Sequence, residues 1–103
     1  MQLTITDSAA LLYKKEIPLY DGDTIRLYVR VGGVGSGGFS VGIMKDLPTD
    51  TSFKIQKQGI TFFVTEDDFW YLDGMTIQYD EDTGYLDFSN PRFSQLDHPE
   101  KHV

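Results

Sequence analysis

The sequence predicts an α+β domain that is mainly β, with about seven short strands and one or two short helices. Two observations lead to this prediction. Apolar and polar residues alternate in several short segments, which is the pattern of half-buried strands. Aromatic residues make up 14% of the chain, which supplies a core to 103 residues without disulfides. We therefore expect one domain over residues 1–93, followed by a polar tail over residues 94–103.

The first two elements are a short strand over residues 2–6 and a helix over residues 8–15. Thr6 or Asp7 is expected to cap the helix, because a side-chain oxygen there accepts a backbone N–H that would otherwise lack a partner. A helix of two or three turns is not stable alone in water, so we expect it to pack against the sheet.

The clearest strand spans residues 24–31, and a glycine-rich loop joins it to a second alternating strand over residues 39–44. Arg26 and Arg30 are expected on the more exposed face of the first strand. The opposite face is expected to be buried, and it carries five apolar side chains: Ile25, Leu27, Val29, Val41 and Ile43.

Two further pairs of strands are expected in the second half of the chain. They are residues 53–56 with 60–64, and residues 75–79 with 85–88. The second pair is expected to form a hairpin, because the sequence between its strands is prone to turn. A short helical turn is expected over residues 66–71, where the acidic residues at the start favour a helix N-terminus. Within this turn Trp70 is the candidate for an exposed contact residue.

The charge is unevenly divided along the chain. The net charge is −7, with seven basic and six acidic side chains in residues 1–57 but two basic and ten acidic side chains in residues 58–103. No lysine or arginine lies between Lys57 and Arg92. Such an acidic surface repels phosphate backbones, so we expect no nucleic-acid partner. We expect the acidic half to form a solvated face rather than a cation site.

The absence of cysteine excludes several chemistries. A chain without cysteine forms no disulfide and supplies no thiolate as nucleophile, zinc ligand or iron–sulfur ligand. No apolar segment approaches the roughly 18 residues that a membrane span needs, and the first residues lack the features of a signal peptide. We therefore expect a cytoplasmic protein without a membrane partner.

Five segments resemble, in their order and spacing, those of one known family. They are residues 5–9, 29–33, 38–40, 72–79 and 86–91. The family is the HesB-like, or A-type iron–sulfur carrier, family. The resemblance implies a compact mixed β-sheet fold, a barrel-like sandwich with a small helical component. It also favours a homodimer as the assembly.

The cluster ligands of that family are missing from this sequence. Its best-known members deliver iron or iron–sulfur clusters with three cysteines, one in the glycine loop and two in a Cys-Gly-Cys sequence near the C-terminus. Here the loop reads Val34-Gly35-Ser36-Gly37, and the tail has no cysteine. The resemblance therefore implies the fold without the cluster, and it identifies the chain as a member of a cysteine-free branch with no expected cofactor.

The glycine loop is one candidate binding site. Residues 33–38 match the pattern G-x-G-x-x-G, but a strand follows them instead of the helix that a dinucleotide site needs. Successive N–H groups in the loop can form an anion-binding nest. The alternative is a wide loop that binds nothing. The candidate ligand-binding residues are Arg30, Gly33, Gly35, Ser36, Gly37, Gly38 and Ser40.

The tail holds the candidate metal site. His98 and His102 are spaced so that a helix would place both imidazoles on one side, with Asp97 and Glu100 nearby. Pro99 weakens such a helix, so the alternative is a polar tail without metal. Both histidines of the chain lie in this tail and no serine has an activating neighbour in sequence, so we expect no enzymatic activity.

These observations leave three hypotheses for function. The first is a non-enzymatic HesB-like domain that acts as a binding or interaction module, related to iron–sulfur cluster assembly carriers but without the cluster ligands. The second is a metal or anion carrier that uses the glycine loop over residues 32–38 or carboxylate and histidine ligands. The third is a small enzyme of unknown substrate.

Overall fold

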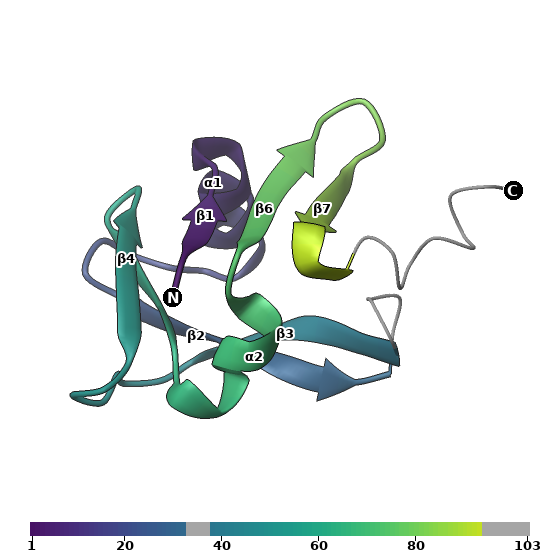
Figure 1. Cartoon of the computed structure of the whole chain (residues 1–103). Coiled ribbons are helices and arrows are strands. Elements are labelled where there is room, and N and C mark those ends of the chain that lie inside the picture. The colour runs from purple at the N-terminus through teal and green to yellow at the C-terminus, as the bar shows by residue number, and fades with distance from the viewer. Residues whose placement is uncertain (33–37, 94–103) are drawn as a thin grey trace, which may run out of the picture.

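The computed structural model describes residues 1–32 and 38–93, so part of the glycine loop and the predicted tail lie outside the described residues (Figure 1). In chain order the elements are β1 (Leu3–Ile5), α1 (Asp7–Glu16), β2 (Thr24–Val31), β3 (Phe39–Lys45), β4 (Phe53–Lys57), β5 (Ile60–Val64), η2 (Glu66–Asp68), α2 (Phe69–Leu72), β6 (Met75–Asp80), β7 (Tyr85–Ser89) and η3 (Pro91–Phe93). The fold is mainly β with two short α-helices, as the sequence predicts.

The strands form two open sheets. One has the order β1–β6–β7, and the other has the order β3–β2–β5–β4. Figure 1 shows the first sheet beside α1 in the upper part of the view, with β2 and β3 running across the lower part. No ladder joins the two sheets in the part of the chain that the structure describes. The expected barrel-like sandwich is therefore an open pair of sheets that does not close into a barrel.

Parallel pairing brings distant parts of the chain together. β1 pairs parallel with β6, and β2 pairs parallel with β5. Two hydrogen bonds extend the first of these pairings beyond β1. The N–H of Gly74 donates to the carbonyl oxygen of Gln2 at 2.6 Å, and the N–H of Gln2 donates to Asp73 Oδ1 at 2.7 Å. The start of the chain is thereby fixed beside the end of α2.

Helix α1 begins where the sequence predicts. Thr6 is the N-cap, and its Oγ1 accepts a hydrogen bond from the N–H of Ala9 at 3.3 Å. The helix buries Ala9, Ala10 and Tyr13 against its neighbours. The ring centroid of Tyr13 lies 5.9 Å from that of Phe62 on β5, and burial raises the pKa of the Tyr13 hydroxyl. The short helix is therefore stabilised by tertiary packing, as its length requires.

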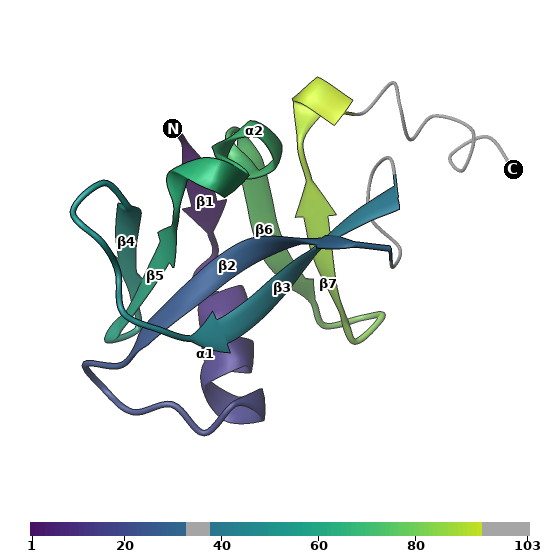
Figure 2. The same cartoon turned by 90° about the horizontal axis from the view of Figure 1, so that it is seen from below.

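The core lies between the two sheets and under α1. Ile25 and Leu27 of β2 are fully buried, as predicted. Val29, Val41 and Ile43 are only half-buried, so the prediction that the whole inward face is buried is wrong for these three side chains. Val41 and Ile43 lie on β3, which is the edge strand of its sheet, so β2 covers them on one side only. Val29 lies near the end of β2, where Figure 2 shows β2 and β3 extending past β7.

Asn90→Ala is expected to lower the free energy of unfolding by about 1–3 kcal/mol, because it removes buried hydrogen bonds. Asn90 is buried, and its Nδ2 donates to the carbonyl oxygens of Tyr71 at 3.2 Å and Asp73 at 2.8 Å. These bonds tie the end of β7 to α2. The measurement is the midpoint of urea unfolding.

Asn90→Asp is the matched variant for this prediction. Its side chain can still accept the hydrogen bond that the N–H of Arg92 donates to Asn90 Oδ1 at 3.0 Å, but it loses both donated bonds. We therefore expect the aspartate variant to be destabilised as well. Unfolding midpoints equal to that of the unmodified chain would show that the two donated bonds do not contribute to stability.

Candidate interaction site

Part of the predicted anion-binding site can be placed. Gly32 and Gly38 close the glycine loop, since the N–H of Gly32 donates to the carbonyl oxygen of Gly38 at 2.6 Å. Their φ angles of 94° and 85° lie in the left-handed region that favours glycine. Arg30 and Ser40 are opposite each other in the β2–β3 ladder. The remaining predicted residues lie outside the described residues: Gly33, Gly35, Ser36, Gly37, His98 and His102.

The side chain of Arg30 lies along the sheet. A Cβ atom at Gly42 would lie 2.5 Å from Tyr28 Cζ and 2.6 Å from Arg30 Cδ, so both side chains pack directly over this glycine. Gly42 is further from the loop than Ser40, so the stem of Arg30 runs away from the loop. Arg30 is exposed, as predicted. The structure does not bring this stem to the described part of the loop, and anion binding stays a prediction.

Arg26 connects the four-stranded sheet to the segment before α2. Its Nη2 donates to Asp68 Oδ2 at 3.4 Å and to Thr65 Oγ1 at 3.3 Å. Its guanidinium carbon lies 5.8 Å from the ring centroid of Tyr28. Thr65 directly precedes η2, and Asp68 directly precedes α2. The contacts of Arg26 with both residues therefore fix where α2 begins.

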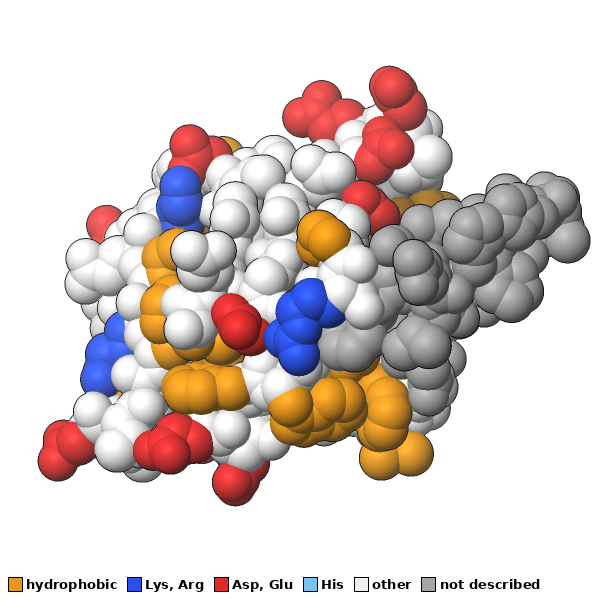
Figure 3. All heavy atoms as spheres, in the orientation of Figure 1, with side chains coloured by type: hydrophobic (Ala, Val, Ile, Leu, Met, Phe, Trp, Pro, Cys, Tyr) orange, Lys and Arg blue, Asp and Glu red, His pale blue; other side chains and the backbone are white. Residues whose placement is uncertain are grey.

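Val31, Phe39 and Trp70 form what we call the apolar patch. Val31 and Phe39 are opposite each other in the β2–β3 ladder, and the ring centroids of Phe39 and Trp70 lie 5.1 Å apart in an edge-to-face arrangement. Val31 is 89% exposed and Trp70 is 46% exposed. Figure 3 shows hydrophobic side chains along the lower edge of the molecule, over α2 and the ends of β2 and β3. Exposed apolar side chains gathered in one place are typical of interaction sites.

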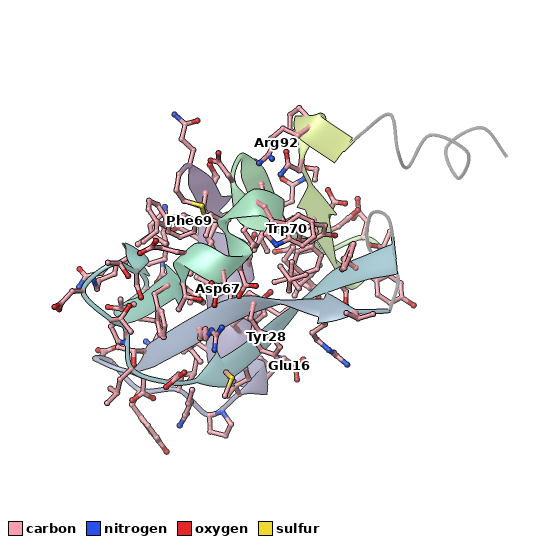
Figure 4. The ribbon with its side chains drawn as sticks, turned by 60° about the horizontal axis from the view of Figure 1, so that its bottom comes forward. Glu16, Tyr28, Asp67, Phe69, Trp70 and Arg92 are labelled. Atoms are coloured by element: carbon pink, nitrogen blue, oxygen red, sulfur yellow. The ribbon has the colours of Figure 1, made fainter. Side chains whose placement is uncertain are left out.

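Helix α2 sets the position of Trp70. The two residues of α2 that follow Trp70, Tyr71 and Leu72, are buried. The hydroxyl of Tyr71 donates to the carbonyl oxygen of Phe39 at 3.2 Å. This bond holds α2 against the start of β3. Figure 4 shows Phe69 and Trp70 leaving α2 in different directions. Trp70 is therefore held in place from below while its outer face stays open to solvent.

Sequence reasoning identified Trp70 but not its two neighbours on β2 and β3. Val31 and Phe39 continue the alternation of the buried face, so the pattern contains no reason to expect that Val31 is exposed and Phe39 only half-buried. Their position on either side of the glycine loop, at the ends of both strands, is the signal that could have found them. The end of a strand beside a long loop often extends past the helices and strands that pack against the middle of that strand.

The described residues hold no metal centre. Within residues 1–32 and 38–93, no group of three or more histidine and acidic side chains is placed to hold a metal ion. In the same part of the chain, no helix is long and apolar enough to cross a membrane.

Comparisons with known proteins identify relatives of this chain. The family model for iron-sulphur cluster biosynthesis matches residues 1–95. Over 86 residues the chain is 41% identical to the pyruvate dehydrogenase inhibitor of Bacillus subtilis (strain 168). The matched region covers 80% of this chain and 90% of that protein. Over 80 residues it is 36% identical to the putative iron-sulfur cluster insertion protein ErpA of Nitrosomonas europaea, which covers 77% of this chain and 66% of that protein.

A solved structure has the same fold. The crystal structure of IscA with the 2Fe–2S cluster matches with a TM-score of 0.63 over 87% of this chain and 83% of that chain, at 22% sequence identity. An identity this low supports likeness of fold alone. The family model and the relatives confirm the resemblance that the ordered segments indicate. The chain is therefore a member of the iron-sulphur cluster biosynthesis family, and its own sequence contains no cysteine.

Proposed function

We propose that this chain is a non-enzymatic protein that binds pyruvate dehydrogenase and inhibits it. The observation that carries the proposal is the likeness to the Bacillus subtilis pyruvate dehydrogenase inhibitor, which extends over most of both chains. Inhibition by binding needs a complementary surface and no catalytic group of the inhibitor's own. Such a role is compatible with a chain that has no cysteine and whose two histidines lie near its end.

The apolar patch supports a role in protein binding. Aromatic side chains near the centre of an interface contribute much of the binding energy. Trp70 is already held by its contact with Phe39, so it loses little conformational freedom when a partner covers it. Val31 adds an exposed aliphatic side chain beside it. The patch is accordingly the surface proposed to contact pyruvate dehydrogenase.

Iron–sulfur cluster delivery is not proposed for this chain, although the Nitrosomonas europaea relative is named as a putative insertion protein. Iron–sulfur clusters are held largely by cysteine thiolates, and this sequence has none. The fold of the family is proposed to serve here as a scaffold that presents a contact surface.

Inhibition is tested with purified components. We expect the rate of pyruvate dehydrogenase from the organism that encodes this chain to fall as the concentration of the chain rises. The Bacillus subtilis enzyme with its own inhibitor is the positive control, and serum albumin is the negative control. An unchanged rate, together with no binding at micromolar concentrations of the chain, would contradict the proposal.

Trp70→Ala is expected to raise the dissociation constant for pyruvate dehydrogenase about 30-fold, because truncating an aromatic anchor weakens binding by about 2 kcal/mol or more. Val31→Asp is a second variant, which places a charge in the patch and leaves the ring contact between Phe39 and Trp70 in place. Tyr20→Ala is the matched control, since Tyr20 is an exposed aromatic residue outside the patch. The measurement is the dissociation constant from biolayer interferometry. Equal dissociation constants for the unmodified chain and the three variants would exclude the apolar patch as the contact surface. The proposal that the chain inhibits pyruvate dehydrogenase would still stand.

A further inference from the structure

The β6–β7 hairpin carries a concentrated negative charge. Asp80, Glu81, Asp82 and Asp87 line a hollow of about 540 Å³ formed by residues of this hairpin. Figure 3 shows acidic side chains gathered at the top of the molecule, over the turn of the hairpin. None of these four carboxylates forms an ion pair with a residue that the structure describes. The hairpin therefore presents negative charge that the described part of the chain does not neutralise.

Only part of this charge is used to form the turn itself. Asp80 Oδ1 accepts hydrogen bonds from the N–H groups of Asp82 at 2.9 Å and Thr83 at 3.4 Å, which fixes the turn. Asp87 Oδ2 accepts a bond from Gln78 Nε2 at 3.2 Å. The carboxylates of Glu81 and Asp82 are exposed. Both are therefore available to cations from outside the chain.

An apolar groove adjoins the acidic hollow. The groove has a volume of about 230 Å³ and lies between α1 and β6. Its lining residues are Ser8, Leu11, Leu12, Lys15, Tyr79 and Glu81. Tyr79 and Glu81 line both hollows, so the two form one continuous surface. Leu11 is 50% exposed on this surface, whereas Ala9, Ala10 and Tyr13 of the same helix are buried.

We infer that the β6–β7 hairpin and the adjoining face of α1 form a docking surface for a segment of a partner protein in which a large apolar side chain lies next to lysine or arginine residues. The apolar side chain occupies the groove beside Leu11, and the basic groups face Glu81 and Asp82. The inference rests on the proposed function, since the partner is pyruvate dehydrogenase. It adds a second contact surface, because the hairpin turn and the apolar patch lie at opposite ends of the view in Figure 3.

Charge decides which occupant this surface fits. A nucleic acid or an anionic membrane would be repelled by the acidic residues. A second copy of this chain would bring a second acidic hairpin and a further net charge of −7. A basic segment of another protein is attracted instead, and such attraction acts mainly on the rate of association. Exposed charges are screened by salt, so this contribution must fall as the ionic strength rises.

The first test removes the charge and keeps the turn. The variant combines Asp80→Asn, Glu81→Gln and Asp82→Asn, and the asparagine at position 80 retains an oxygen that can accept the two turn bonds. The control combines Glu16→Gln, Asp46→Asn and Asp50→Asn, which changes the net charge equally at exposed positions outside the hairpin. We expect the hairpin variant to associate with pyruvate dehydrogenase about tenfold more slowly at low salt and to lose most of its salt dependence. The control is expected to behave as the unmodified chain.

The second test blocks the groove. Leu11→Arg places a bulky positive charge where the inferred segment docks, and arginine is well tolerated in helices. Leu47→Arg is the matched control, because Leu47 is 79% exposed and lies between β3 and β4, outside the groove. We expect Leu11→Arg to weaken binding about tenfold or more and Leu47→Arg to leave it unchanged. Thermal unfolding of each variant confirms that it is folded.

The outcomes separate the two proposals. If the unmodified chain inhibits and the hairpin variant behaves like its control, the docking surface is overturned while the proposed function stands. If both charge variants slow association equally, only the net charge of the chain matters, and the docking surface is again overturned. If sedimentation shows a dimer of the chain that the hairpin variant loses, the surface binds a second copy instead. An unmodified chain that neither binds nor inhibits pyruvate dehydrogenase overturns both proposals.

Discussion

Leu27→Ala is expected to lower the free energy of unfolding by about 2–4 kcal/mol. Leu27 is fully buried in the core between the sheets, so its truncation removes apolar contacts and leaves a cavity. The total stability of a domain is roughly 5–15 kcal/mol, so this single change removes a large share of it. The measurement is the midpoint of urea unfolding, compared at an unchanged slope with denaturant.

Leu47→Ala is the matched control for this prediction, because it deletes the same atoms from a side chain that is 79% exposed. Its expected effect is within about 0.5 kcal/mol. Val29→Ala is expected to fall between the two, since Val29 is half-buried near the far end of β2. Equal midpoints for the Leu27 and Leu47 variants would show that the inward face of β2 is wrongly assigned.

Anaerobic reconstitution with iron and sulfide is expected to leave the purified chain colourless after desalting. The physical reason is that no thiolate is available anywhere in the sequence, and a second copy of the chain adds none. Carboxylate and imidazole ligands would hold iron only in exchange with solvent and only where they are deprotonated. The measurements are visible absorbance and the content of iron and acid-labile sulfide.

The control for reconstitution is the same procedure applied to the Nitrosomonas europaea relative. A brown product with stoichiometric sulfide on this chain would overturn the prediction and would require a thiol from elsewhere, such as glutathione. If iron is retained without sulfide, the double variant His98→Ala, His102→Ala distinguishes the tail from the acidic half. Loss of iron in that variant would make the two histidines metal ligands.

Much of the fold could be predicted because its signals are local. The cap at Thr6 depends on one side chain and the helix that follows it. The alternation of β2 correctly placed Ile25 and Leu27 in the core. Alternation says which way a side chain points, but it does not say how far the covering layer extends. Val29 and its half-buried neighbours on β3 were therefore expected to be buried when they are not.

The candidate site was harder to predict because it depends on contacts between distant segments. Trp70 was identifiable as a large aromatic residue in a short helical turn. Its contact with Phe39 depends on how α2 packs against β3, and no sequence pattern records that arrangement. The groove beside Leu11 depends in the same way on α1 lying next to β6. The acidic hairpin was visible as a run of charge, but its adjoining apolar groove was not.

The parallel pairing of β1 with β6 has a consequence for how the chain folds during synthesis. Gln2 and Asp73, which are hydrogen-bonded in the structure, are 71 positions apart. The entropy cost of closing a loop of that length arises before the strand contacts that offset it have formed. We therefore expect this sheet to form slowly. As the chain leaves the ribosome, the apolar side chains of Leu3 and Ile5 emerge long before their partners Met75 and Ile77 exist. Strand β1 therefore reaches its native place only after residues 75–77 have been synthesised.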